Sequence, residues 1–439
     1  MTSLLDHPTP PPRSGFHGLD PAAIPVGSIG TAQMLAGIGG DLTPHAAHLG
    51  VHGPLPRLSR DRLLAELDQV ALAGRGGAAY PVAAKIRALR SGSTPAVVVN
   101  GAEGEPASAK DHVLLARAPH LVLDGATLLA DAVGAPRIVV AVTDPRVAQV
   151  LATALASRPD GARFEVRLLA SRFLAGEAHA LISALNGGNG LPPGRQVHAT
   201  ARGLDGAPTL LFNAETCAQL AVLARSRPDA HTAAGTAGSP VTTLLTVSGA
   251  VASPGVLEVP CGVELGQVLR ACGAAPPQAV VLGGYHGTWL APDPTQRLSV
   301  TALAAAGGTF GAGVVAVLGL DTCPLAELTA VAAWLAGESA RQCGPCAFGL
   351  PALAEDLTAL LTGRTPTETL GGTVHRHAQQ VAGRGACAHP DGAARFITTA
   401  LSLLNQDIST HQAYGTCRRP HRGHLALTRA EALTPRTGH

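Results

Sequence analysis

Between residues 97 and 213, short β-branched runs alternate with stretches of helical apolar spacing, and this alternation constrains the fold more than any other feature. The β-branched runs predict strands at 97–99, 137–142, 164–169 and 209–212. The stretches between them predict helices at 121–133, 147–156 and 178–185. Strands alternating with helices are typical of a largely parallel sheet covered by helices. The sequence therefore predicts an α/β sandwich.

A glycine-rich loop at 74–81 precedes the first of these strands. Gly74, Gly76 and Gly77 free the backbone to curl and to approach a ligand closely. Pro81 suits the first turn of a following helix, and a glycine loop leading into a helix can hold a phosphate with backbone N–H groups. The spacing fits neither the dinucleotide fingerprint nor the P-loop. We expect an anion-binding loop, with an ordinary tight turn as the alternative.

The chain's lysines are concentrated next to this loop. Arginine supplies almost every positive charge, and lysine occurs only at Lys85 and Lys110. A compact ammonium is poorly replaced by a planar guanidinium where a tight site needs a point donor. Between the two lysines, residues 100–106 follow the first strand at its carboxyl end, where open α/β sheets bind ligands. At least one lysine is therefore expected to hold an anionic or carbonyl group.

Four further parts are predicted outside the sandwich. Two strands, a helix and further strands after residue 240 favour a small β-grasp domain. The helix patterns beyond Pro324 favour a four-helix bundle. The Pro-rich start and the Arg- and Pro-rich end lack periodicity. The predicted parts are a flexible N-terminal lead at 1–55, the α/β domain at 56–235, the β-grasp domain at 240–322, the helical domain at 325–408 and a disordered tail at 409–439.

Three of the eight cysteines form a candidate metal centre. In a long chain without an export signal, spaced cysteines favour metal or redox use over disulfides. Cys343 and Cys346 open a predicted helix, whose N-terminus favours thiolates, and Cys387 lies just before another. They could hold an iron–sulfur cluster or zinc, or no metal. A thioredoxin-like redox pair is disfavoured, because no βαβ entry of the usual kind precedes the motif.

Composition limits the class of protein. The net charge of +2 gives no reason to expect a nucleic-acid partner. No apolar run reaches the roughly 20 residues that span a bilayer, and the start lacks a signal-peptide pattern. The sequence predicts a cytoplasmic protein without direct membrane insertion.

The glycine block with Lys85, and the block Asn-Gly-Ala-Glu-Gly-Glu-Pro at 100–106 with Lys110-Asp111, carry a resemblance to a known family. They resemble the flavin-binding region of the NADH-binding flavoprotein subunit of respiratory complex I, whose family includes hydrogenase and formate dehydrogenase subunits. The resemblance extends from about Leu63 to about Leu404. It implies a divergent member that binds FMN and an iron–sulfur cluster.

By this resemblance, Glu103 and Glu105 line the ring end of the flavin as catalytic residues, and Tyr80 and Glu105 contact the substrate. Without the resemblance, Glu177 could simply stabilise a first helical turn, and Asn213 with Thr216 could cap a helix. The implied FMN-binding residues are Gly74, Arg75, Gly76, Gly77, Lys85, Asn100, Glu103, Gly176, Glu177, Asn213 and Thr216.

The chain departs from the family at the cluster. The family holds a 4Fe-4S cluster with Glu-Ser-Cys-Gly-x-Cys-x-Pro-Cys and one distant cysteine. Cys343, Cys346 and Cys387 match three ligands, and Ala340 stands at the first position. Three thiolates suit a 4Fe-4S cluster with another fourth ligand, such as Gln342 or Cys323, or a 3Fe-4S cluster.

Other departures lie on the nucleotide side. Ala102 and Ala178 replace acidic residues of the family, Phe212 replaces an asparagine, and Gly194 stands where an aromatic residue would stack on the nucleotide. Tyr80 keeps one aromatic ring. The two lost carboxylates and the lost ring remove contacts worth about 1–2 kcal/mol each. The departures predict weakened NADH binding.

Three functions follow as hypotheses. In the first, NADH or another donor reduces FMN, which passes electrons to the cluster. In the second, the chain is an FMN-bearing adaptor to a ferredoxin-like partner without NADH activity. In the third, it is a scaffold that has lost its cofactors. The expected partners are the electron donor and a ferredoxin-like or thioredoxin-fold iron–sulfur subunit.

Overall fold

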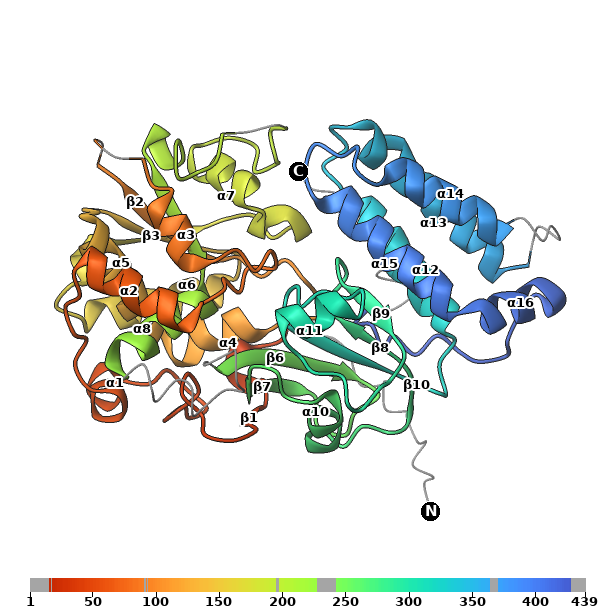
Figure 1. The fold of residues 1–439 in the computed structure, drawn as a ribbon, viewed down its shortest axis with the longest axis horizontal. Coiled ribbons are helices and arrows are strands. Elements are labelled where there is room, and N and C mark those ends of the chain that lie inside the picture. Colours follow the sequence, from red (N-terminus) through yellow and green to blue (C-terminus); the bar gives the residue numbers. More distant parts are fainter. Residues whose placement is uncertain are drawn as a thin grey trace, which may run out of the picture.

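The computed structural model describes residues 16, 18–90, 92, 94–194, 197–226, 242–363 and 370–427. In Figure 1, an α/β sandwich and a helical bundle lie on either side of a smaller mixed sheet. Three predicted features fall outside the described residues. They are residues 1–15 of the N-terminal lead, the domain boundary between 235 and 240, and residues 428–439 of the tail.

Four parallel strands form the sheet of the sandwich, in the order β4-β3-β2-β5. Every residue of β2, β3 and β5 is buried. Continuous apolar burial is what a parallel strand covered on both faces requires, and the predicted α/β sandwich is confirmed. The strands are β2 Ala96–Gly101, β3 Ile138–Val142, β4 Phe164–Leu168 and β5 Thr209–Asn213.

Alternate side chains of β2 divide between two cores. Val97 and Val99 pack with apolar residues of α5 and α8, whereas Val98 packs with Leu181 and Leu185 of α7. Gly125 lets α5 and α8 touch, because a Cβ there would lie 1.8 Å from a backbone oxygen of α8. The helices are α2 Arg60–Val70, α3 Val82–Arg87, α4 Lys110–Arg117, α5 Pro119–Val133, α6 Pro145–Ala156, α7 Ala178–Leu185 and α8 Ala214–Arg225.

Six strands form the smaller sheet, in the order β1-β7-β6-β10-β8-β9. β6 and β10 run parallel at its centre, and β7 and β8 flank them as antiparallel partners. Leu265 and Val268 of α10 (Leu265–Ala271) pack on one face. This is the strand arrangement of the predicted β-grasp. The strands are β1 Val26–Ser28, β6 Thr242–Gly249, β7 Gly255–Pro260, β8 Pro277–Leu282, β9 Thr288–Leu290 and β10 Val314–Gly319, and α11 spans Val300–Ala305.

The predicted flexible lead at 1–55 is wrong from residue 18 onward. A short turn of 3-10 helix, η1, spans Pro21–Ala23, β1 joins the smaller sheet beside β7, and α1 forms over His45–His52. Glu258 accepts hydrogen bonds from the backbone N–H groups of residues 33, 34 and 35 at 2.9–3.0 Å. The Pro- and Gly-rich composition concealed this order, because the partners lie more than 200 positions away.

Four helices form the predicted bundle, and Figure 1 shows them packed along one another at one end of the molecule. Among the described residues, no single helix is long and apolar enough to cross a bilayer; α4 and α5 together meet that test by length and composition only, with a 96° bend between them. The bundle helices are α12 Pro324–Gly337, α13 Leu350–Leu361, α14 Leu370–Val381 and α15 His389–Leu403.

The predicted disordered tail at 409–439 is also wrong for its described part. α16 (Asn405–Tyr414) crosses the predicted boundary. Beyond it, Leu425 and Leu427 are buried in the core of the bundle. The backbone carbonyl of Pro420 accepts a hydrogen bond from the N–H of Cys323 at 2.8 Å. Sparse leucines among many arginines gave no periodic signal for this packing.

Candidate functional site

The glycine loop is fixed against the carboxyl end of β5. The Asn213 amide donates to the carbonyl of Arg75 at 3.1 Å, and the Thr216 hydroxyl accepts from the Arg75 N–H at 2.9 Å. Asn213 also caps α8 by accepting from the N–H of Thr216. The capping interpretation of these residues is therefore correct, and the same contacts hold the loop at the sheet edge.

The loop leaves open space on its outer side. Gly77 has a φ of 94°, and a Cβ there would meet nothing within 4 Å. A Cβ on Gly76 would only touch Asn213, at 4.0 Å. Lys85 of α3 donates to the carbonyl of Leu211, and burial lowers its pKa. Since an ammonium has three N–H donors, Lys85 has donors left for a ligand.

The loop after β2 is tied to the start of α7. The Asn100 amide donates to the carbonyl of Gly176 at 2.8 Å, and its oxygen accepts from the N–H of Ala102. A Cβ on Gly176 would lie 2.9 Å from the carbonyl oxygen of Ala102, so this approach needs glycine. Glu177 caps α7 by accepting two backbone N–H groups, at 2.8 and 2.9 Å. Ala102, Gly176 and Glu177 therefore lie together.

Glu103 and Glu105 have protein partners. Glu103 accepts from the N–H of His112 at 2.9 Å and holds the start of α4. Glu105 accepts from the N–H of Tyr285 at 2.8 Å and links this loop to the smaller sheet. Burial raises the pKa of Glu105 to about 7, against the opposing effect of the N–H groups of Tyr285 and Ala107. A catalytic role for either residue stays a prediction that these contacts do not support.

Four buried charges lie beneath the loops. The ammonium of Lys110 is 2.9 Å from carboxylate oxygens of both Asp111 and Glu215. Burial alone would lower the pKa of Lys110, but these carboxylates outweigh it and raise the pKa. The guanidinium of Arg75 lies 4.0 Å from Glu215 and 3.0 Å from the sulfur of Cys261. Lys110 and the Arg75 side chain thus serve this network, so the predicted ligand contact falls to Lys85.

Tyr80, predicted to contact the substrate, lies at the end of the glycine loop and is 54% exposed. Its backbone carbonyl accepts from the N–H of Gly74 at 2.9 Å and closes the loop. An exposed ring is available for stacking on a ligand. Its substrate contact stays a prediction.

The three predicted metal-binding cysteines are near enough to affect one another's pKa, although their sulfurs do not all lie within 4.8 Å of one another. Cys346 lies on a π-helical turn, η5 (Pro345–Gly349). Burial and the thiols of Cys343 and Cys387 raise the pKa of Cys346 to about 12. The backbone N–H of Arg341 opposes the rise in the pKa of Cys346. Cys323 is the N-cap of α12, a helix of 14 residues, and the cysteine loop follows the opposite end of that helix. A helix of this length spans about 20 Å, so Cys323 is too far away to be the fourth ligand.

The sequence alone did not reveal that the candidate flavin site and the cysteine site are in contact. Phe173, just before Gly176, donates its N–H to Glu338 of the cysteine loop at 3.0 Å. Its ring packs edge-on against Trp334 of α12, with 5.1 Å between centroids. Glu177 is close enough to Cys387 to help raise that thiol's pKa, after the larger effect of burial. Glu338 is the first residue of the segment that matches the family's cluster-binding motif. Its place there was the one indication in the sequence that it belongs to a site.

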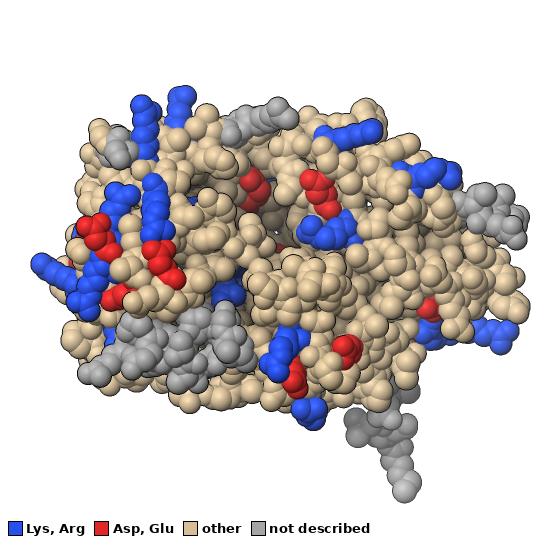
Figure 2. All heavy atoms as spheres, viewed as in Figure 1, with Lys and Arg blue, Asp and Glu red and all other residues tan. Residues whose placement is uncertain are grey.

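Figure 2 shows that the face containing these loops is hollowed near its middle, between α7 and the helical bundle. Acidic side chains lie along the wall of the hollow, with basic atoms beside them at its right-hand edge, and most other basic side chains lie around the outside of the α/β sandwich. The surface between the two candidate sites is therefore recessed.

Comparisons with known proteins match both sites. Residues 67–222 match the Nuo51 FMN-binding domain, and residues 326–411 match the NADH-ubiquinone oxidoreductase-F iron-sulfur binding region. The chain is 27% identical over 389 residues to the F subunit of the NADH-quinone oxidoreductase of Streptomyces coelicolor, covering 84% of this chain and 86% of that protein. It is 31% identical over 248 residues to the alpha subunit of the NAD-reducing hydrogenase HoxS of Cupriavidus necator, covering 52% and 41%.

A solved structure supports the same relationship. The crystal structure of an NAD+-reducing [NiFe]-hydrogenase in the H2-reduced state matches with a TM-score of 0.76 and 26% identity, covering 90% of this chain and 68% of that chain. Both matched regions occur here in one chain, and the sequence relationship extends over most of its length. The chain therefore belongs to the family of NADH-quinone oxidoreductase F subunits and related hydrogenase subunits, as a divergent member.

Proposed function

We propose that the chain binds FMN between the glycine loop and the carboxyl ends of β2 and β5, holds an iron–sulfur cluster at Cys343, Cys346 and Cys387, and transfers electrons between the two. The contact of Phe173 and Glu177 with the cysteine region carries this proposal. It joins one wall of the flavin site to the metal site without an intervening layer.

The residues present fit FMN. Gly76 and Gly77 leave open space on the outer side of the loop, and Lys85 has unused donors for a phosphate or a ribityl hydroxyl. Bound FMN supplies the ability to take an electron pair and to release electrons singly. The protein's part is to position it, with Asn100 fixing the loop after β2 to Gly176.

The cysteines fit an iron–sulfur cluster. Backbone N–H groups of Arg341 and His389 favour the thiolate forms of Cys346 and Cys387 by opposing the rise in their pKa, and such groups near the sulfurs also tune the potential of a bound cluster. Arg341 has a φ of 52°, a left-handed conformation that costs about 1 kcal/mol or more outside glycine. The loop keeps this conformation although the side chain of Ala340 has no atom that could bind iron. We propose a 3Fe-4S cluster, or a 4Fe-4S cluster with a fourth ligand other than cysteine.

The residues present say less about the identity of the electron donor than about the cofactors. Ala102 and Ala178 are both partly buried beside the apolar core under α7, at the wall where the family carries acids. Their loss favours a second candidate, an FMN-bearing adaptor that exchanges electrons with a ferredoxin-like or thioredoxin-fold iron–sulfur partner. NADH-dependent bleaching of the flavin spectrum separates the two candidates.

Lys85→Ala is expected to weaken FMN binding 10- to 100-fold, since it removes a charge-assisted hydrogen bond worth about 1.5–3 kcal/mol. Flavin released on denaturation, measured by fluorescence per mole of protein, reports occupancy. Arg87→Ala is the control, because Arg87 lies on the same helix and pairs with exposed Asp68. Equal occupancy in all three proteins would contradict the role of Lys85, and absence of FMN from the parent would contradict the site.

Combining Ala102→Asp with Ala178→Glu is expected to raise NADH-driven dye reduction at least tenfold, because two contacts of about 1–2 kcal/mol return. Ala152→Glu, which adds an acid on the exposed side of α6, should leave the rate unchanged. Rapid NADH oxidation by the unmodified chain would argue against the weakened nucleotide site. No gain in an FMN-loaded double variant would show that these positions do not face the nucleotide.

A further inference from the structure

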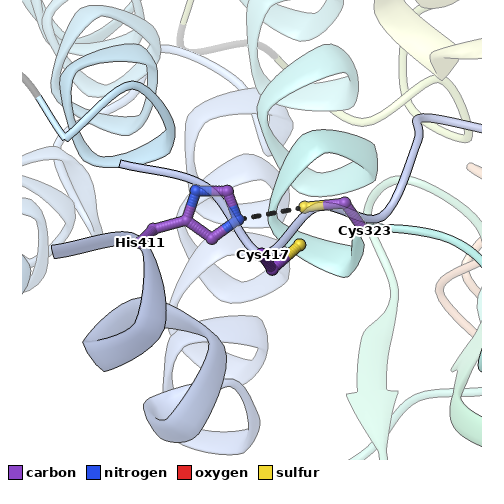
Figure 3. Close-up of side chains that lie close together, drawn as sticks. All are labelled: Cys323, His411 and Cys417. Carbon is purple, nitrogen blue, oxygen red and sulfur yellow. Dashed lines mark hydrogen bonds between the residues drawn. The ribbon is translucent and has the colours of Figure 1, made fainter. Parts of the chain in front are cut away.

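A second group of metal-ligating side chains lies at the far end of α12 from the cysteine site. Cys323, His411 and Cys417 place their ligand atoms within 4.8 Å of one another. Figure 3 shows the His411 ring directed at the sulfur of Cys323, with Cys417 beside them. The Nε2 of His411 is 3.3 Å from the sulfur of Cys323. Three segments meet here: the start of α12, the end of α16 and the chain that follows it.

The orientation of His411 suits a metal ligand. Its Nδ1 lies 2.8 Å from the backbone carbonyl oxygen of Leu361. A carbonyl only accepts, so the proton of the neutral ring belongs on Nδ1 and the lone pair on Nε2 faces the two sulfurs. A second nitrogen held by a carbonyl is the usual support of a metal-binding histidine.

The two cysteines complete a soft donor set. Cys323 caps α12, and its sulfur accepts from the N–H of Ala326 at 3.4 Å. A helix N-terminus stabilises a thiolate. Cys417 is half-buried in the turn after α16, where Gly415 adopts a φ of 71°. Two thiolates and one imidazole are typical zinc ligands.

We propose that Cys323, His411 and Cys417 bind one zinc ion, with water at the fourth coordination position. Binding converts both thiols to thiolates, releases two protons and involves no change of oxidation state. The ion would tie residues 415–427 to the start of α12, where the N–H of Cys323 already donates to Pro420. This tethering role is independent of the flavin and of the iron–sulfur cluster.

The experiment uses the full chain, purified anaerobically with a reductant. Mass spectrometry of the metals should find one zinc per chain alongside any iron, falling to near zero in Cys417→Ser. Cys272→Ser is the matched control, because Cys272 is a buried cysteine of the smaller sheet's core. His411→Gln gives a second variant with an intact thiol pair and should also lose zinc.

Cobalt provides a readout that iron cannot supply. In a chain carrying Cys343→Ser, Cys346→Ser and Cys387→Ser, one Co²⁺ should bind with a thiolate charge-transfer band, and zinc should displace it. Adding Cys417→Ser should weaken cobalt binding at least tenfold and abolish the rise in Tm on adding zinc. The proposal is overturned if the reduced parent holds no stoichiometric zinc, if Cys417→Ser binds equally, or if Cys323 and Cys417 form a disulfide in the freshly prepared protein.

Discussion

Lys110→Met should destabilise the folded chain by about 3–5 kcal/mol, because it leaves two buried carboxylates to be balanced by one guanidinium, that of Arg75, which lies 4.0 Å from Glu215. The side chains of Lys110 and Glu215 are 3% and 0% exposed, and that of Asp111 is 12% exposed. Glu215 also accepts hydrogen bonds from Thr243 and Leu244 of β6, so it cannot regain water without opening the interface between the sandwich and the smaller sheet. The urea midpoint measured by far-UV circular dichroism, in chains freed of cofactors, reports the loss.

Two comparisons test the cause of that loss. Arg87→Met breaks an ion pair whose side chains are about half exposed, so it should cost no more than about 1 kcal/mol. Adding Glu215→Gln to Lys110→Met restores the balance of buried charge and should recover part of the stability. A Lys110→Met midpoint equal to that of Arg87→Met would show that solvent or protonation relieves the buried acids.

Cys346→Ser should remove the iron–sulfur cluster almost completely. Cys346 is 1% exposed and adjoins both other cysteines, and only two thiolates would remain. Iron and acid-labile sulfide per chain, together with the EPR signal of the dithionite-reduced protein, measure the loss. Cys272→Ser should keep the parent values. Iron and sulfide equal to the parent in Cys346→Ser would disprove the assignment of this cysteine.

The companion variant Ala340→Cys restores the fourth family ligand. If the parent holds a three-iron cluster, its EPR signal in the oxidised protein should give way to that of a reduced four-iron cluster. The iron content should rise to match. An unchanged spectrum would mean that residue 340 does not face the cluster, or that another group already fills the fourth position.

The sequence predicted the parts of the fold that depend on local pattern. The predicted helix at 178–185 has the bounds of α7, and each predicted strand between 97 and 212 lies within two residues of an observed one. β-branched runs and helical spacing act over a few residues, so a single sequence records them.

The incorrect predictions concern segments whose contacts are with residues far away in the sequence. Glu258 holds the chain at residues 33–35, and Leu425 lies in the core of the bundle, but neither contact leaves a periodic pattern. For the site, the sequence indicated which blocks matter but not what each side chain touches. Glu103 and Arg75 were predicted to contact the cofactor, and that contact stays a prediction. The sequence did not indicate that the Glu103 carboxylate accepts a backbone N–H or that the Arg75 side chain binds other side chains.

The pairing of β1 with β7 sets an order of events during synthesis. Gln33 and the Glu258 side chain that binds its N–H are 225 positions apart. At about 5–20 residues per second, a ribosome needs roughly 10–45 s to travel that distance. The early segment leaves the ribosome without the strand beside which it will lie. Parts of the segment can dock earlier, because Arg117 and Asp124 already hold residues 24, 39 and 48. Until β7 is made, however, β1 lacks its partner strand and residues 33–35 lack the carboxylate that binds them, so slower translation of the middle of the gene would lengthen their exposure to proteases.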